Sequence, residues 1–179
     1  KPVAMAPMAL PRGLLVYLAD AIKKVVNIPV ITVGRINTPQ LAEDILREGK
    51  ADLIAMGRAL VADPDLPQKA ARGEVEEICP CIACNVGCVD RVVYSDEDLK
   101  CAVNPWVGEE GSLPLTHATT CKKVLVVGGG PAGMEAAIMA AKRGHSVTLW
   151  ERKDSLGGQM LLAALPPGKE EIYNLIEYL

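Results

Sequence analysis

The stretch KVLVVGGGPAGMEAAIMAAKRGHSVTLWE, residues 123–151, decides the fold of the last part of this chain. Its β-branched beginning, KVLVV at 123–127, predicts a strand. The small and apolar residues of Ala132–Arg143 predict a helix that ends at the following glycine, and SVTLW at 146–150 predicts a second strand. The order strand, glycine-rich turn, helix and strand indicates a dinucleotide-binding βαβ unit.

The glycines of the turn have separate roles in such a unit. Gly128 makes the tight turn after the strand, Gly130 lets a pyrophosphate approach the backbone, and Gly133 lets the helix pack closely on the strand. Glu151 follows the second strand, where a carboxylate accepts hydrogen bonds from both ribose hydroxyls and disfavours a 2′-phosphate. The alternative is a glycine-rich turn that binds no ligand, and the flanking strands and helix favour the dinucleotide site.

The first part of the chain also predicts a parallel α/β arrangement. Two continuous apolar runs, IPVITVG at 28–34 and ADLIAMG at 51–57, are typical of parallel strands buried on both faces. Helical patterns surround these runs: Pro11–Val26, a helix from the capping pair Thr38 and Pro39 to Gly49, and RALVADPDLPQKAARG, where Asp63 and Pro64 predict a second cap. We therefore expect helices and strands to alternate here with short loops.

Both predicted strands end in glycine and arginine, VGR at 33–35 and MGR at 56–58. A glycine lets the backbone approach a ligand, and the planar donors of an arginine suit a phosphate. Adjacent parallel strands end at the same edge of a sheet, and in (β/α)8 barrels a phosphate site follows strands 7 and 8. Arg35 and Arg58 are therefore candidate phosphate ligands, the alternative being two surface arginines on turns.

Four of the six cysteines, Cys81, Cys84, Cys88 and Cys101, follow the spacing C-x2-C-x3-C-x12-C. Thiolates with this spacing can hold a [4Fe–4S] cluster or a tetrahedral zinc ion, and the spacing itself leaves both open. The neighbouring dinucleotide motif favours the cluster, because a cluster carries single electrons. Cys79 is too close to Cys81 for the usual chelate, and Cys121 is expected to be a small buried residue.

Composition narrows the class of protein. The chain has 179 residues, half of them apolar, and a net charge of −3, so it can bury a core and offers no basic surface for nucleic acid or an anionic membrane. No apolar run reaches the ~20 residues of a membrane span, and the first residues lack a secretory pattern. We therefore expect a soluble, cytoplasmic chain whose cysteines bind metal or do redox work.

The order of these motifs resembles one family. GRINTPQLAEDIL, ADLIAMGRALVADPDLPQKA, CIACNVGC with CAVNP, GGGPAGMEAA, SLGGQ and PPGKEE are similar to segments of the 2,4-dienoyl-CoA reductase and 2-enoate reductase group of NADH:flavin oxidoreductases, relatives of old yellow enzyme and trimethylamine dehydrogenase. The resemblance implies the C-terminal portion of a (β/α)8 FMN barrel at 1–75, a [4Fe–4S] cluster segment and linker at 76–120, and the start of a Rossmann-like FAD domain at 121–179. Because a whole barrel takes ~250 residues, we expect a piece of a longer protein.

The resemblance also assigns roles to particular positions. Arg35, Gly57 and Arg58 are expected to hold the FMN phosphate, Cys81, Cys84, Cys88 and Cys101 the cluster, and Gly128, Gly130, Ala132, Gly133, Glu151, Gln159 and Lys169 the FAD. Electrons are expected to pass from NAD(P)H to FAD, singly through the cluster, and on to FMN, which reduces the C=C bond of an enoyl or enoyl-CoA substrate. The catalytic acid and the substrate-binding residues are expected outside this chain.

Two other functions stay open at this point. An amine dehydrogenase within the same family would share these parts, and a small electron-transfer module would need no substrate chemistry. His117 and His145 are expected in solvent rather than in catalysis. Two barrel strands alone would leave open edges and an apolar face, so the piece is expected to be inactive by itself and prone to aggregate or to form a homo-oligomer.

Overall fold

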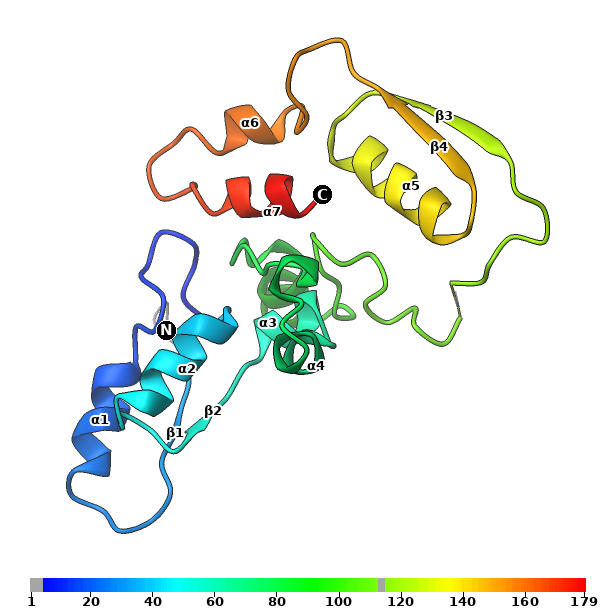
Figure 1. Ribbon diagram of the computed structural model, residues 1–179. Coiled ribbons are helices and arrows are strands. Elements are labelled where there is room, and N and C mark those ends of the chain that lie inside the picture. The colour runs from blue at the N-terminus through cyan, green and yellow to red at the C-terminus, as the bar shows by residue number, and fades with distance from the viewer. Residues whose placement is uncertain (1–4, 113–114) are drawn as a thin grey trace. The chain divides into compact units, whose positions relative to one another are not determined.

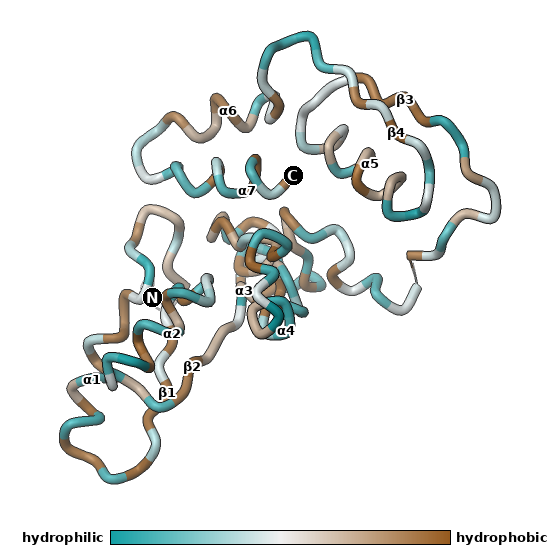
Figure 2. Tube along the Cα trace, in the orientation of Figure 1, coloured by the Kyte–Doolittle hydropathy of each residue, from teal (hydrophilic) through white to brown (hydrophobic). Residues whose placement is uncertain are grey.

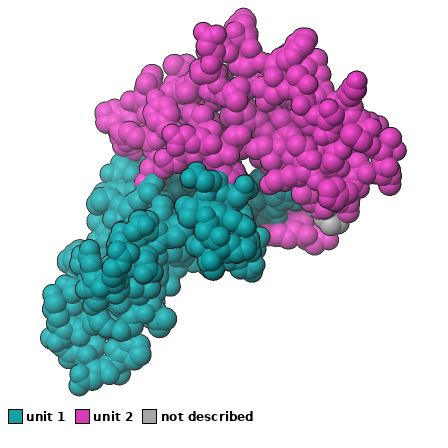
Figure 3. Space-filling model, in the orientation of Figure 1, with its two compact units in different colours: residues 1–108 teal, residues 109–179 magenta. Residues whose placement is uncertain are grey.

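The computed structural model describes residues 5–112 and 115–179, and the chain divides into two compact units, residues 1–108 and 109–179 (Figure 3). Unit 1 contains α1 (Val16–Lys23), β1 (Ile31–Thr32), α2 (Pro39–Arg47), β2 (Leu53–Ile54), α3 (Arg58–Ala62), α4 (Leu66–Ala71), the 3-10 turn η1 (Val75–Glu77) and the π-helix η2 (Val86–Tyr94). Unit 2 contains β3 (Lys123–Val127), α5 (Pro131–Lys142), β4 (Ser146–Trp150), α6 (Met160–Ala163) and α7 (Ile172–Tyr178). The chain is therefore an α/β protein in both units, and Figure 1 labels the helices and strands of each unit.

Unit 1 is built on a short parallel pair. β1 lies beside β2, with Ile31 opposite Leu53 and Thr32 opposite Ile54. The connection between them is α2, whose first turn is capped as predicted: the backbone N–H of Leu41 donates to Thr38 Oγ1 at 3.3 Å, and Pro39 opens the helix. Gly49 has a φ of +69° just after the helix, where a left-handed residue is favoured.

The two strands are shorter and more exposed than the sequence predicts. One face of the pair packs on α1 and α2, around Val16, Ile36 and Ile45. On the other face Ile31 and Leu53 are 59% and 52% exposed, so burial on both faces is wrong for the described part of the chain. Figure 2 shows the apolar colouring that continues along β2. Further strands and helices normally cover both faces of a parallel sheet, and within the described residues one face of this pair lacks that cover.

The first helix is also shorter than its apolar pattern. The pattern predicts a helix over Pro11–Val26, whereas α1 begins at Val16. Gly13 has a φ of +67°, which a right-handed helix cannot contain, and its carbonyl oxygen accepts from the N–H of Val16. The four residues after Pro11 therefore form a turn that leads into the helix.

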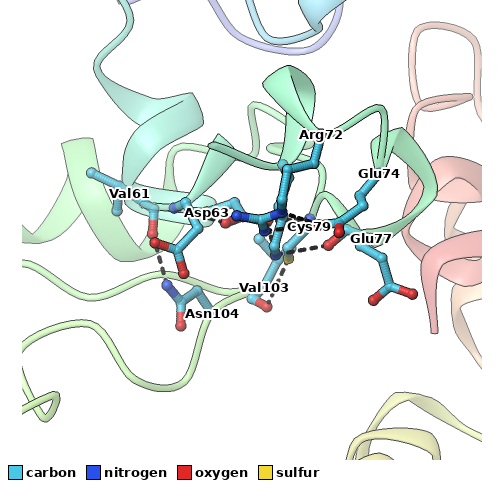
Figure 4. Close-up of polar contacts among 10 residues, drawn as sticks. Val61, Asp63, Arg72, Glu74, Glu77, Cys79, Val103 and Asn104 are labelled. Carbon is cyan, nitrogen blue, oxygen red and sulfur yellow. Dashed lines mark hydrogen bonds and ion pairs between the residues drawn. The ribbon is translucent and has the colours of Figure 1, made fainter. Parts of the chain in front are cut away.

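Asp63 differs from its predicted role. It ends α3, and α4 begins three residues later at Leu66 instead of at an Asp63–Pro64 cap. The buried Asp63 carboxylate accepts from the Lys69 ammonium at 2.7 Å and from the backbone N–H of Cys79 at 2.8 Å. Figure 4 shows Asp63 beside Cys79, with the nearby Asn104 Nδ2 donating to the Val61 carbonyl at 3.0 Å. Asp63 thus anchors the start of the cysteine segment to α3 and α4.

Unit 2 follows its sequence closely. β3 and β4 occupy the predicted residues and pair in parallel over five positions, from Lys123 opposite Ser146 to Val127 opposite Trp150. α5 packs on one face of this pair and buries Met134. Gly144 follows α5 with a φ of +88°, in agreement with the predicted end of the helix. The strands alternate between half-buried residues that face α5 and exposed ones on the opposite side.

No helix within residues 5–112 and 115–179 is long and apolar enough to cross a membrane.

Candidate functional site

The two glycine–arginine pairs of unit 1 meet at one cavity. This cavity has a volume of about 230 Å³ and is lined by Gly34 and Arg35 from the end of β1 and by Gly57 and Arg58 from the start of α3. Asn37, Cys81 and Ala83 complete part of its wall. The parallel pairing of β1 with β2 brings the two strand ends to the same edge, as the sequence predicts.

Arg35 lies in the wall of this cavity and has an unusual backbone conformation. Its φ is +54°, its side chain is largely buried, and Nη1 donates to the Met8 carbonyl at 2.8 Å. Gly34 before it has a φ of +121°, and a Cβ there would lie 3.0 Å from the Leu15 side chain. Gly34 is therefore required by the fold itself, and it turns the chain so that Arg35 reaches the cavity.

Gly57 differs from Gly34 because nothing in the described chain requires a glycine there. Its φ is −99°, and a Cβ at this position would meet no atom within 4 Å. A bare backbone beside open space, with Arg58 next to it, leaves room for a ligand to approach closely. The cavity therefore fits a phosphate-bearing group such as that of FMN.

Asn37 adds a polar atom to the same wall. Its Nδ2 donates to the Cys81 carbonyl at 3.0 Å, which fixes the orientation of the amide. Its Oδ1 is buried and, among the described residues, accepts no hydrogen bond. A hydroxyl or N–H group of a bound ligand could supply that donor, because buried polar groups are normally satisfied.

The four cysteines of the C-x2-C-x3-C-x12-C set line a second pocket of unit 1. Cys81, Cys84, Cys88 and Cys101 surround it, together with Arg58 and Asn85. All four are free thiols. Burial raises the pKa of Cys81 above its ordinary value, while the Ala83 N–H and the Arg58 charge oppose that rise. The four thiols predicted from the spacing therefore line one pocket, and their role as metal ligands stays a prediction.

Cys101 joins the other three thiols across a long gap in sequence. Burial is again the largest cause that raises its pKa, against the backbone N–H groups of Val103 and Asn104. Charges on Cys84 and Cys88 would raise it further, which places these thiols within electrostatic reach of one another. Backbone N–H groups directed at the sulfurs are what an iron–sulfur cluster uses to stabilise its charge.

A zinc ion and a cubane cluster would arrange the four thiols differently. Within residues 5–112 and 115–179, no three side chains of His, Cys, Asp or Glu come together as the ligands of one metal ion. A single zinc ion needs its four sulfurs about 2.3 Å from one centre. A cubane cluster instead binds each thiolate at a separate iron, so its sulfurs lie further apart.

Gly87 brings Cys101 to the other cysteines, a role that the sequence analysis did not find. The N–H of Lys100 donates to the Gly87 carbonyl at 2.9 Å. A Cβ at Gly87 would lie 2.7 Å from the Lys100 carbonyl oxygen and 2.9 Å from Cys101 Cα. Only a glycine lets the 100–101 backbone pack this closely on the first turn of η2.

Asn85 is a second residue of this segment whose role the sequence did not indicate. Asn85 has a φ of +64°, a conformation that asparagine tolerates better than most residues, and it precedes η2. Its Oδ1 accepts from Arg58 Nη1, and its Nδ2 donates to the Met5 carbonyl at 3.0 Å. Ala83, with a φ of +49°, makes a second left-handed turn in the same loop.

The two remaining cysteines lie outside the pocket lining. Cys79 is buried, and its Sγ donates to the Val103 carbonyl at 3.4 Å, which suits a packing role. Cys121 is exposed, so the expectation of a buried residue is wrong. It lies two residues before the start of β3.

In unit 2 the glycine-rich turn has the close approach that its motif requires. Gly128 has a φ of +110°, which favours glycine. A Cβ on Gly133 would lie 1.9 Å from the Gly128 carbonyl oxygen, so the first turn of α5 could not pack as it does with any other residue. These two glycines are therefore explained by the chain's own packing.

Gly130 is the exception within this turn. Its φ is −78°, and a Cβ there would meet nothing within 4 Å. It precedes α5, whose first turn holds Pro131 and the exposed Ala132. Open space beside a bare backbone at the start of a helix of twelve residues fits a pyrophosphate.

Glu151 closes the turn from the other side. Its Oε2 accepts from the Gly129 N–H at 2.7 Å and its Oε1 from the Lys153 N–H at 2.9 Å. The N–H groups of Lys153 and then Gly129 are the main causes that lower the pKa of this half-buried carboxyl below its ordinary value. Glu151 therefore remains ionised at neutral pH, at the position where a ribose acceptor is expected.

The last two predicted FAD contacts lie further along unit 2. The segment before Gln159 reaches the turn, since the Gly157 N–H donates to the Gly129 carbonyl at 2.7 Å. Gln159 is exposed and precedes α6. Lys169 is exposed in the connection between α6 and α7, and its contact with a cofactor stays a prediction.

Comparison with known proteins gives two family matches. Residues 16–77 match the NADH:flavin oxidoreductase / NADH oxidase family, and residues 123–171 match the FAD dependent oxidoreductases. The NADH oxidase of Thermoanaerobacter brockii is 54% identical over 172 residues, which are 96% of this chain and 26% of that protein.

Solved structures agree with these matches. A 2-naphthoyl-CoA reductase in complex with 2-naphthoyl-CoA superposes with a TM-score of 0.91 at 41% identity, over 96% of this chain and 26% of that one. Histamine dehydrogenase from Rhizobium sp. 4-9 superposes with a TM-score of 0.89 at 33% identity, over 97% of this chain and 26% of that one. The chain spans about a quarter of the length of the relatives that it matches.

The glycine–arginine cavity lies in the first matched segment and the βαβ turn in the second: residues 16–77 belong to the NADH:flavin oxidoreductase / NADH oxidase family, and residues 123–171 belong to the FAD dependent oxidoreductases.

Proposed function

We propose that this chain is part of an iron–sulfur flavoprotein reductase. In that protein, electrons from NAD(P)H pass through FAD and a [4Fe–4S] cluster to FMN, and the C=C bond of an enoyl or enoyl-CoA substrate is reduced. FMN and FAD supply hydride chemistry when bound, and the cluster supplies single-electron transfer. The chain's own residues bind and orient these groups, and the substrate-binding residues lie in the rest of the protein.

One observation carries this proposal: the two pockets of unit 1 share a wall. Arg58, Cys81 and Ala83 line both the glycine–arginine cavity and the cysteine pocket. A metal site that served only to stabilise the fold would gain nothing from such proximity. A cluster that exchanges electrons with a flavin does gain from it, because electron transfer weakens steeply with distance.

Each group of residues has a defined task in this proposal. Arg58 donates charge-assisted hydrogen bonds to the FMN phosphate, and the bare backbone at Gly57 admits it. Arg35 adds its charge from the other strand. In unit 2, Gly130 admits the FAD pyrophosphate, and Glu151 accepts from the ribose hydroxyls. Asp63 and Gly87 hold the cysteine segment in place.

An amine dehydrogenase is the second candidate, because histamine dehydrogenase superposes with nearly the same TM-score as the CoA reductase. The sequence favours the reductase, since identity is 41% to the CoA reductase and 33% to the amine dehydrogenase. The two functions share the cofactor sites of this chain and differ in the substrate that meets FMN.

The direct test uses the full-length protein, prepared without oxygen. We expect FMN, FAD and about four irons per chain, and oxidation of NADH or NADPH on addition of an unsaturated acid or its CoA thioester. Histamine or dimethylamine with an artificial electron acceptor is the competing assay. Turnover of the amines alone would establish the second candidate, and stoichiometric zinc without iron would contradict both.

Two variants separate the flavins. Arg58→Ala removes a charged phosphate partner and should weaken FMN by about 1.5–3 kcal/mol while FAD stays bound. Glu151→Ala should deplete FAD while FMN stays bound, so the protein reduces substrate only when FMN is reduced chemically. Flavin content by chromatography and both half-reactions are the measurements, and equal loss of both flavins from either variant would contradict the two-site assignment.

A further inference from the structure

We propose that the phosphate cavity and the cysteine pocket of unit 1 assemble cooperatively, and that Asn85 and Asn37 are the positioning residues that couple them. The inference rests on the proposed function, because it takes FMN and a cluster as the two ligands. It adds a property that neither site has alone: each ligand raises the affinity of the other.

Asn85 is the first link. It belongs to the cysteine loop, directly after Cys84, and both ends of its amide are used outside that loop. Its Oδ1 accepts from Arg58 Nη1 and its Nδ2 donates to the Met5 carbonyl at 3.0 Å. Met5 and Arg58 both line the phosphate cavity. The position of the loop therefore sets the direction of the guanidinium that would hold the phosphate.

Asn37 is the second link. It belongs to the wall of the phosphate cavity and holds the cysteine segment, whereas Asn85 belongs to the cysteine segment and holds a residue of the cavity. Asn37 follows the first glycine–arginine pair, and its side chain is nine-tenths buried in the cavity wall. Its Nδ2 donates to the carbonyl of Cys81, the first of the four cysteines, at 3.0 Å. A ligand that satisfies the buried Oδ1 of Asn37 would hold this amide, and with it the backbone of Cys81, in place.

The loop needs such support because it is held in costly conformations. Ala83 and Asn85 both have positive φ values, of 49° and 64°. Such residues persist only when the surrounding structure fixes them. Cluster ligation would fix the loop from the thiol side. FMN binding would fix it through Arg58, which the phosphate contacts, and through Asn37, whose Oδ1 accepts from a hydroxyl or N–H group of the same ligand. Each of the two binding events therefore orders part of the loop, and the other event then has less of the loop to order.

The sign of the coupling distinguishes this inference from a simpler electrostatic effect. An anionic cluster and a phosphate would compete for the one Arg58 charge and would repel each other, so direct electrostatics makes the coupling negative. Ordering of a shared loop makes it positive. Thermodynamic linkage requires the same factor in both directions, which supplies two independent measurements of it.

The experiment uses the full-length protein with FAD bound. The dissociation constant of FMN is measured by quenching of its fluorescence in cluster-containing protein and in protein stripped of iron by anaerobic chelation, with circular dichroism as the check of folding. We expect FMN to bind about tenfold more tightly when the cluster is present. Iron retention against a chelator, with and without FMN, should give the same factor.

Variants identify the residues that carry the coupling between the two sites. In Asn85→Ala the factor by which the cluster increases FMN affinity should fall to near one, and Asn37→Ala should lower this factor as well. Asn104→Ala is the matched control, because Asn104 also ties the cysteine segment to α3, through Val61, but contacts no residue of the phosphate cavity wall. It should keep the wild-type factor even if it weakens iron binding.

The outcomes separate this inference from the proposed function. A protein that takes up neither iron nor FMN would contradict the proposed function. A protein that takes up both, with equal FMN affinity in the two iron states or with weaker affinity beside the cluster, would overturn only the cooperativity. A wild-type factor retained in both Asn85→Ala and Asn37→Ala would overturn the role of these two residues. The wild-type measurement decides the main point even if a variant fails to fold.

Discussion

The two units of this chain build their candidate sites in opposite ways. In unit 2 the turn and its acidic partner lie in one continuous βαβ segment, residues 123–151. In unit 1 the two pockets draw on separate stretches around Gly34, Gly57, Cys81 and Cys101. A site made from one segment needs only its own strand pairing and helix packing. A site made from distant segments depends on every tie between them.

The strands show the same difference. β3 and β4 pair over five residues, whereas β1 and β2 pair over two. The longer pair holds its turn by a contact within the segment, at Gly133 and Gly128. The shorter pair receives its support from long-range ties such as Asp63 to Cys79 and Asn85 to Arg58. Substitutions should therefore affect one unit's site and leave the other's intact.

The largest expected effect is the loss of the cluster from unit 1. Cys81→Ser and Cys101→Ser each replace one thiolate ligand with a hydroxyl, and we expect iron and its charge-transfer absorption to be lost in the full-length protein. FAD content should stay at the wild-type level. Cys79→Ser is the control, since Cys79 does not line the pocket and its sulfur already donates to the Val103 carbonyl. Full iron content in Cys81→Ser would remove that residue from the ligand set.

The matching change in unit 2 is Gly133→Ala. Its new Cβ would lie 1.9 Å from a backbone oxygen, so the first turn of α5 must shift. We expect a loss of about 1–3 kcal/mol of stability, typical of overpacking, and depletion of FAD with iron and FMN retained. Thermal unfolding and flavin content are the measurements.

Gly130→Ala supplies the contrast with that change. Its Cβ would enter open space at a negative φ, so unfolding of FAD-free protein should resemble the wild type within about 0.5 kcal/mol. FAD binding should nevertheless weaken, because the Cβ occupies the space that a pyrophosphate needs. If Gly130→Ala binds FAD as tightly as the wild type, the pyrophosphate lies elsewhere.

A smaller effect is expected from Gly87→Ala in unit 1. A Cβ there would press on the Lys100 carbonyl at 2.7 Å, and the 100–101 backbone can move away because it lies in a loop. We expect partial iron content and faster loss of iron to a chelator, with a stability cost of about 1–3 kcal/mol. Gly108→Ala is not a suitable control because its φ of +77° brings strain of its own, so Gly111→Ala, in open space, serves instead. Wild-type iron retention in Gly87→Ala would show that this close approach is not needed.

The same division explains what the sequence could predict. The unit 2 strands were predicted to the residue, and α5 within one residue of each end, because short-range patterns and the glycine turn determine them. The four clustered thiols were also predicted, since their spacing is itself the motif. The lengths of β1 and β2 were not, because a strand's extent depends on its neighbours as well as on its own β-branched residues.

The missed residues of unit 1 share one physical reason. Asp63 looked like a helix cap, and its carboxylate instead binds the N–H of Cys79, sixteen residues away. Gly87 and Asn85 belong to no motif that the sequence analysis used, and their roles depend on Lys100 and Arg58, which the fold places beside them. Such roles exist only in the folded chain, so no local pattern of residues indicates them.

The smallest predicted effect concerns Glu151 and the pH dependence of unit 2. The N–H groups of Lys153 and Gly129 lower the pKa of this carboxyl, so the folded protein prefers the ionised form. The resulting stabilisation is present above the ordinary glutamate pKa, about 4.3, and is lost as the pH falls through the lowered value. Wild-type protein without FAD should therefore lose thermal stability more steeply than Glu151→Gln below about pH 4.5, where the neutral amide has nothing to titrate.

Because Glu151 is half-buried and keeps contact with solvent, this difference in melting temperature should be small, and it is best measured between wild type and variant at matched pH values. Glu170→Gln is the matched control. The backbone N–H groups of Glu170 and Gly168 also lower the pKa of Glu170, and neither of them belongs to the glycine-rich turn. Both variants should flatten the acid limb of the stability curve, and only Glu151→Gln should weaken FAD. Parallel curves for wild type and Glu151→Gln from pH 7 to about pH 3.5 would mean that the two N–H contacts do not hold this carboxylate in solution.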